Sequence, residues 1–119
     1  MFLRNKDKER LLQIFALSEI PIEVLAHGSR VDGTSHDGSD LDLVVRAKDG
    51  KKLPIEVYIF LKEKIKHSNI PILVEFFDWY RLPENFQKNI LNNYEILFNS
   101  NNMLLQEPSS DYKNPNEEE

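Results

Sequence analysis

Two aspartates at alternate positions, Asp40 and Asp42, are the side chains best placed to do chemistry in this sequence. Residues i and i+2 of a β-strand point to the same face, so both carboxylates can bind one or two divalent cations while the neighbouring leucines face the core. A Gly28-Ser29 turn lies upstream. Glycine lets backbone N–H groups approach anionic oxygens, and a following helix start would aim its positive end the same way. The combination predicts a site for a metal-held triphosphate.

A third carboxylate is expected from a later apolar segment. Glu75 interrupts the apolar run at residues 72–77, and a lone charge in a buried strand is costly unless it meets a cation or a partner. We therefore predict that Glu75 completes a two-metal site for nucleotidyl transfer, with a water-facing strand edge as its alternative. Asp78 lies three residues further on and projects differently. It is predicted to cap or turn the strand end, and replacement of Glu75 as the ligand is its alternative.

The spacing of these residues resembles the signature of the nucleotidyltransferase superfamily related to DNA polymerase β. The matching positions are Gly28-Ser29, Gly33, Ser39-Asp40 and Asp42-Leu43. Within the superfamily, the chain is most similar to the minimal nucleotidyltransferases. Residues 74–79 look like the strand that carries the third carboxylate of that family, and residues 82–86 look like the helix start that follows it.

The resemblance implies a nucleotidyltransferase that uses Mg²⁺ or Mn²⁺ and transfers AMP from ATP to a hydroxyl, such as a tyrosine, of a partner protein. Minimal nucleotidyltransferases are often the antitoxin partners of all-helical HEPN proteins. The implied catalytic and metal-binding residues are Asp40, Asp42 and Glu75, and the implied nucleotide-binding residues are Gly28, Ser29, Arg30 and Ser39. For Arg30, contact with the triphosphate and a plain surface position both stay open.

Two positions depart from the family pattern. Glu75 stands where the minimal subgroup usually has aspartate, although larger relatives use glutamate there. Asp32 stands where the family often has a second arginine, and this reversed charge argues for weaker nucleotide affinity or an altered substrate. Two other functions therefore remain open: a binding module that neutralises a helical partner by contact alone, and an enzyme that modifies a small molecule.

Composition narrows the class of protein further. The chain has 119 residues, 40% of them hydrophobic, which suits one domain with a modest core. Most of the net charge of −5 comes from residues 107–119, where five acids face one lysine, so extended nucleic-acid binding is not expected. Cysteine is absent, the N-terminus is charged, and no apolar run is long enough for a membrane span. We expect a soluble cytoplasmic protein, and the sequence leaves a homo-oligomer open.

Hydrophobic periodicity predicts helices and strands in alternation. Helices are expected at about residues 6–18, 54–66 and 83–93, with a short helical turn at 28–33, and the last helix should bury Phe86 and Ile90. Strands are expected at about 22–27, 40–46, 71–77 and 95–98. These elements predict an α/β nucleotidyltransferase core in residues 1–99, with a small mixed sheet of three to four strands and helices mainly on one face. Residues 100–119 are predicted to form a disordered acidic tail.

Overall fold

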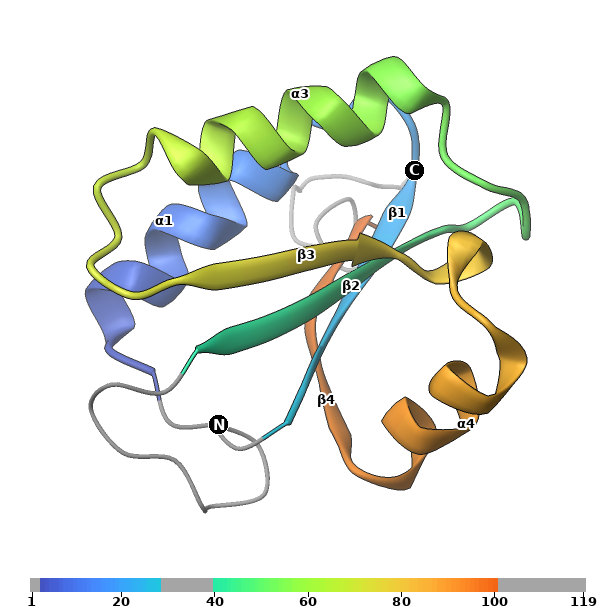
Figure 1. Ribbon diagram of the computed structural model, residues 1–119. Helices are drawn as coiled ribbons and strands as arrows, with labels where there is room; N and C mark the ends of the chain where they lie inside the picture. Colours follow the sequence, from blue (N-terminus) through green and yellow to red (C-terminus); the bar gives the residue numbers. More distant parts are fainter. Residues whose placement is uncertain (1–2, 29–39, 101–119) are drawn as a thin grey trace, which may run out of the picture.

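A four-stranded mixed sheet forms the centre of the molecule in the computed structural model, which describes residues 3–28 and 40–100 (Figure 1). The strand order is β3-β2-β1-β4; β1 is antiparallel to β2 and β4, and β2 is parallel to β3. The elements along the chain are α1 (Asn5–Phe15), β1 (Ile22–His27), β2 (Leu41–Ala47), α3 (Ile55–Lys66), β3 (Val74–Asp78), the 3₁₀ helix η1 (Trp79–Arg81), α4 (Glu84–Asn92) and β4 (Tyr94–Asn99). The helical turn predicted at 28–33 and almost all of the predicted tail lie outside the described residues.

The main hydrophobic core lies between the sheet and the two longer helices. Figure 1 shows α1 and α3 together on one side of the sheet. Along α3, Val57, Leu61 and Ile65 are buried at a spacing of four residues, which places them on one helical stripe. The ring of Phe15 in α1 stacks on Phe76 in β3 with 5.8 Å between ring centroids. These contacts clamp α1 and α3 to the same face of the sheet.

The opposite face of the sheet is covered less completely. There α4 and η1 pack on the sheet through a small buried cluster of four residues, Leu25, Val44, Trp79 and Ile90. Ile90 is buried as predicted, but the prediction for Phe86 was wrong, because its side chain is 43% exposed. Only one stripe of the nine-residue helix α4 faces the sheet. The small cluster buries Ile90 and leaves Phe86 exposed.

The observed architecture confirms the predicted α/β fold class with a small mixed sheet. The first strand has the predicted bounds, and the others differ from the prediction by a few residues. The first helix ends earlier than predicted because Ser18 closes a local turn: its hydroxyl donates to the carbonyl of Ile20 (2.7 Å) and accepts from the Ile20 amide (3.3 Å). None of the helices within residues 3–28 and 40–100 is long and apolar enough to cross a bilayer.

Candidate active site

A row of polar residues crosses three adjacent strands on the face of the sheet that α4 partly covers. Asp42 of β2 is the register partner of His27 in β1 and of Glu75 in β3. Register partners on neighbouring strands project to the same face of a sheet. The sheet therefore brings the second predicted aspartate and the predicted third carboxylate to adjacent positions, and it places His27 beside them.

The two aspartates influence each other electrostatically. Asp42 is half-buried, and Asp40 is exposed immediately before β2. Burial raises the pKa of Asp42 above its ordinary value; the nearby His27 opposes this, and the charge of Asp40 adds to it. The charged form of Asp42 is thus held in an unfavourable environment, which a bound cation would relieve.

The backbone at the end of β1 lies directly against the Asp42 carboxylate. Gly28 has a φ of +86°, in the left-handed region that favours glycine. A Cβ atom at this position would collide with Oδ2 of Asp42. The structure therefore brings the predicted phosphate-binding turn and the predicted metal ligand together at Gly28. The other predicted nucleotide-binding residues, Ser29, Arg30 and Ser39, lie outside the described residues.

Glu75 and Asp78 belong to the same strand but point to opposite faces. Asp78 is fully buried on the α3 side and is held by three donors: the Leu53 amide (2.9 Å), the Tyr80 amide (3.2 Å) and Nε of Arg81 (3.1 Å). This arrangement confirms the predicted capping role of Asp78. Glu75 is half-buried on the face of Asp42. Its catalytic role stays a prediction.

Oxygen donors dominate the candidate metal site, and hard divalent cations such as Mg²⁺ prefer oxygen ligands. Among the described residues, no three aspartate, glutamate or histidine side chains converge closely enough to hold an ion. The carboxylates of Asp40, Asp42 and Glu75 nevertheless have the chemistry that Mg²⁺ or Mn²⁺ prefers, and the absence of a side chain at Gly28 leaves room for the Asp42 carboxylate. Within the described ranges these three carboxylates do not form one three-ligand group.

His27 borders the carboxylates on the β1 side. Its Nε2 atom is buried and has no hydrogen-bond partner within the part of the chain that the structure describes. Burial lowers the pKa of His27 below its ordinary value, and the Asp42 charge opposes that shift. A neutral ring is therefore favoured near pH 7. The ring meets Phe86 of α4 edge to face, with 6.4 Å between centroids.

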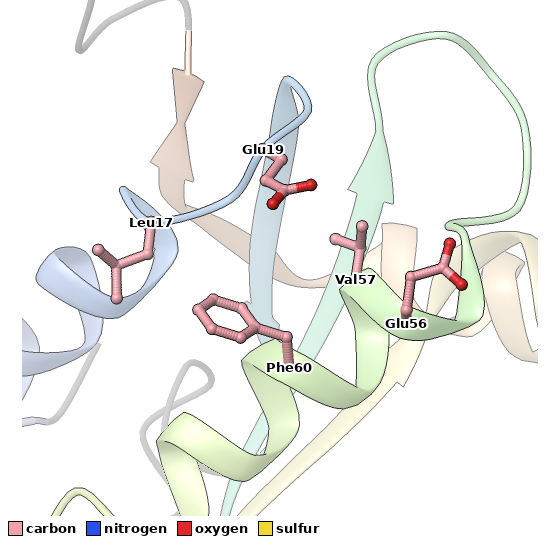
Figure 2. A pocket seen from close by; sticks show the side chains of 5 residues that line it. All are labelled: Leu17, Glu19, Glu56, Val57 and Phe60. Carbon is pink, nitrogen blue, oxygen red and sulfur yellow. The ribbon is translucent and has the colours of Figure 1, made fainter.

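A separate hollow lies between the end of α1 and the first turns of α3 (Figure 2). It has a volume of about 210 Å³ and is lined by Leu17, Glu19, Glu56, Val57 and Phe60. Figure 2 shows the two glutamates at this hollow, and no lysine or arginine lines it within residues 3–28 and 40–100. Two unneutralised carboxylates repel a triphosphate. This hollow, which is separate from the row of His27, Asp42 and Glu75, is therefore a poor site for a nucleotide.

Comparisons with known proteins identify a family and similar folds. The family described as "Polymerase beta, Nucleotidyltransferase" matches residues 9–103. A crystal structure of a toxin-antitoxin with AMP-PNP is similar, with a TM-score of 0.63 at 18% identity, over 82% of this chain and 78% of that chain. A "putative nucleotidyltransferase from Sulfolobus solfataricus" aligns at 16% identity over 81% of this chain and 86% of that chain, with a TM-score of 0.46. No curated protein matches the sequence. At such identities, the structural likeness shows the fold alone.

Proposed function

Because the chain belongs to the polymerase β nucleotidyltransferase family, we propose that it transfers AMP from ATP to a hydroxyl of a partner protein. The observation that carries this proposal is the contact geometry at Gly28, where the backbone that follows β1 lies against the Asp42 carboxylate. This geometry supports a triphosphate lying beside a cation-binding carboxylate, as nucleotidyl transfer requires.

The residues of the row have separate tasks in this proposal. Asp40 and Asp42 would hold Mg²⁺ or Mn²⁺, which would neutralise the charge that builds on the phosphate oxygens while the acceptor oxygen bonds to the α-phosphorus and pyrophosphate leaves. Glu75, in register with Asp42 on the same face, orients the acceptor hydroxyl and receives its proton. Ser29, Arg30 and Ser39 contact the phosphates, by the spacing of the family signature.

A helical, HEPN-type protein is the partner that we propose. The similar crystal structure at 18% identity is that of a toxin-antitoxin with AMP-PNP, which supports a role for this chain as the nucleotide-using member of such a pair. The described residues form one sheet with its covering helices and offer no second domain to hold an acceptor. An acceptor carried by a separate protein fits that arrangement.

Neutralisation of the partner by contact alone is the second candidate function. Two observations support it. The carboxylates of Asp40, Asp42 and Glu75 do not converge among the described residues, and the sequence departs from the family pattern at Asp32 and Glu75. The two candidates differ in one measurable respect. Only the enzyme needs a cation and a triphosphate.

The test is the double variant Asp40→Asn, Asp42→Asn, which removes two negative charges and keeps the side-chain shapes. We expect magnesium-dependent ATP binding, measured by calorimetry, to fall at least about 100-fold, with the melting temperature retained. Transfer from labelled ATP to the product of the neighbouring reading frame should disappear. The matched control is Glu19→Gln, Glu56→Gln, which removes two carboxylates at the hollow of Figure 2. It should leave binding and transfer unchanged. Equal ATP binding by the wild type and the Asp40, Asp42 variant would contradict the enzyme assignment and favour neutralisation by contact.

A further inference from the structure

A hollow of about 260 Å³ opens beside the phosphate-binding turn, between the end of β1 and α4. Its lining consists of His27 and Gly28 from the sheet and Phe86, Asn89, Ile90 and Asn93 from α4 and its C-cap. The four residues from α4 follow the spacing i, i+3, i+4, i+7, so they form one stripe of the helix. The stripe faces the turn whose backbone touches Asp42. The hollow therefore adjoins the candidate active site.

The size of the hollow limits what it can hold. Pockets that enclose a whole drug-sized ligand measure roughly 300–1,000 Å³. A volume of about 260 Å³ suits one heterocyclic ring better than a complete nucleotide. A nucleotide bound here would place its base in the hollow and leave its phosphates outside, over Gly28 and Asp42.

An aromatic ring forms one wall of the hollow. Phe86 is 43% exposed, and its ring is held against His27 in an edge-to-face contact. An exposed large apolar side chain that is already positioned by a neighbour can stack on a flat ring without first losing much side-chain freedom. Base stacking on such a ring is sequence-tolerant, because every base has a π-face.

Two amide side chains supply the polar part of the lining. Asn89 and Asn93 are exposed, and neither side chain makes a hydrogen bond with another residue in the described ranges. An amide presents a donor and an acceptor side by side, which matches the amino group and the ring nitrogen of adenine. Guanine offers a carbonyl oxygen where adenine has that amino group, and an amide turned by about 180° around its last side-chain bond matches guanine instead. The two asparagines can therefore form hydrogen bonds with the edge of either base.

We propose that this hollow is the base subsite of the nucleotide, with Phe86 stacking on the base and Asn89 and Asn93 forming hydrogen bonds with its edge. This inference rests on the proposed use of a nucleoside triphosphate. It adds to that function the residues that contact the base, and all of them lie outside the family signature and the carboxylate row.

The first experiment separates binding of the base from binding of the phosphates. Phe86→Ala is compared with Leu91→Ala, which truncates another exposed apolar residue of α4 that does not line the hollow. The probes are ATP and inorganic tripolyphosphate, each with magnesium, measured by calorimetry. Phe86→Ala should weaken ATP binding about tenfold and leave tripolyphosphate binding unchanged, because stacking contributes about 1–3 kcal/mol per base. Leu91→Ala should change neither.

The second experiment tests the hydrogen bonds to the edge of the base. Asn89→Leu removes the amide and keeps the side-chain size; Asn92→Leu makes the same change at an α4 position outside the lining. ATP binding should weaken about fivefold in Asn89→Leu, as expected for the loss of one hydrogen bond, and stay unchanged in Asn92→Leu. Tripolyphosphate binding should be unchanged in both variants.

The outcomes separate this proposal from the function on which it rests. If the wild type binds both ATP and tripolyphosphate, and Phe86→Ala binds ATP with unchanged affinity, the base subsite is overturned and the proposed function stays intact. An unchanged ATP affinity in Asn89→Leu would overturn the role of the amide. Binding of neither ATP nor tripolyphosphate by the wild type would overturn both proposals. Circular dichroism and melting temperature establish that each variant is folded before binding is measured.

Discussion

The two faces of the sheet differ in how many buried residues they carry and in whether they carry the candidate site. Among the described residues, the α1 and α3 side has seventeen buried residues in one continuous cluster, and the α4 side has four. Since buried apolar area provides most of the favourable free energy of folding, the larger cluster carries most of the stability. The smaller cluster leaves room for the row of His27, Asp42 and Glu75 at one end of its face. The residues that contribute most to stability and the residues of the candidate site thus lie on opposite faces of the sheet.

Strand β3 shows this separation within three residues. Asp78 and Glu75 are both acidic, yet Asp78 holds two backbone amides and an arginine on the core side, whereas Glu75 lies in register with Asp42 on the other face. Similar chemistry therefore serves the fold at one position and the candidate site at the other. Residue type alone does not distinguish the two roles.

The largest contrast is expected between Asp78→Asn and Glu75→Gln. Asp78→Asn disrupts the hydrogen bonds of a buried carboxylate, so we expect the free energy of unfolding to fall by about 1–3 kcal/mol, with the transfer activity of the folded fraction retained. Glu75→Gln should leave stability within about 0.5 kcal/mol, retain nucleotide binding and abolish transfer. Urea unfolding and transfer from labelled ATP measure the two effects. Transfer that survives in Glu75→Gln and disappears in folded Asp78→Asn would reverse the two assignments.

A smaller effect is expected from an alanine at Gly28, with Gly50 as the matched control. Both glycines have positive φ values, +86° and +80°, so either substitution should destabilise the protein by roughly 1–2 kcal/mol. Only at Gly28 would the new Cβ collide with the Asp42 carboxylate; at Gly50 the nearest atom is the Tyr80 hydroxyl oxygen at 4.0 Å. We expect only Gly28→Ala to lose magnesium-dependent ATP binding. Equal losses in both variants would show that backbone strain alone acts at Gly28.

The pH dependence of stability should reveal the burial of His27. Its folded pKa is lowered by burial, so the unfolded chain takes up a proton more readily as the pH falls through the ordinary value of about 6.5. The wild type should therefore lose stability, relative to His27→Gln, between about pH 7.5 and about pH 5.5, and the loss should level off below the folded pKa. Urea unfolding at several pH values measures this difference. His67→Gln provides a control, because it removes a histidine that is exposed. If the free energy of unfolding has the same pH dependence in the wild type and in His27→Gln, the burial of the His27 imidazole is contradicted.

The smallest effect is expected from deletion of residues 107–119, which lie outside the described residues. This segment has five acids, one lysine and, apart from Tyr112, no large apolar side chain. It cannot bury enough surface to offset an ordering entropy of about 1–2 kcal/mol per residue. The melting temperature and the transfer activity should be nearly unchanged. A fall of many degrees would show that the segment packs on the domain and would move the predicted boundary at residue 99.

The sequence by itself determined the elements and the class of fold. Apolar residues recur with the period of a strand or a helix, and this periodicity is a local property that survives without knowledge of the partners of each segment. The alternation around Asp40 and Asp42 predicted that both carboxylates lie on one face of a strand, and their spacing from Gly28 pointed to the family. In the structure Asp42 lies in β2, whereas Asp40 comes immediately before its first residue.

Only the tertiary structure decided which residues meet. The pairing of β2 with β3 sets Asp42 beside Glu75 and sends Asp78 to the core, and the packing of α4 leaves Phe86 exposed beside His27. The contact between Gly28 and Asp42 joins residues that are fourteen positions apart, one directly after β1 and the other in β2. Strand register and helix packing depend on the burial of the whole chain at once, so a local pattern in the sequence does not contain them.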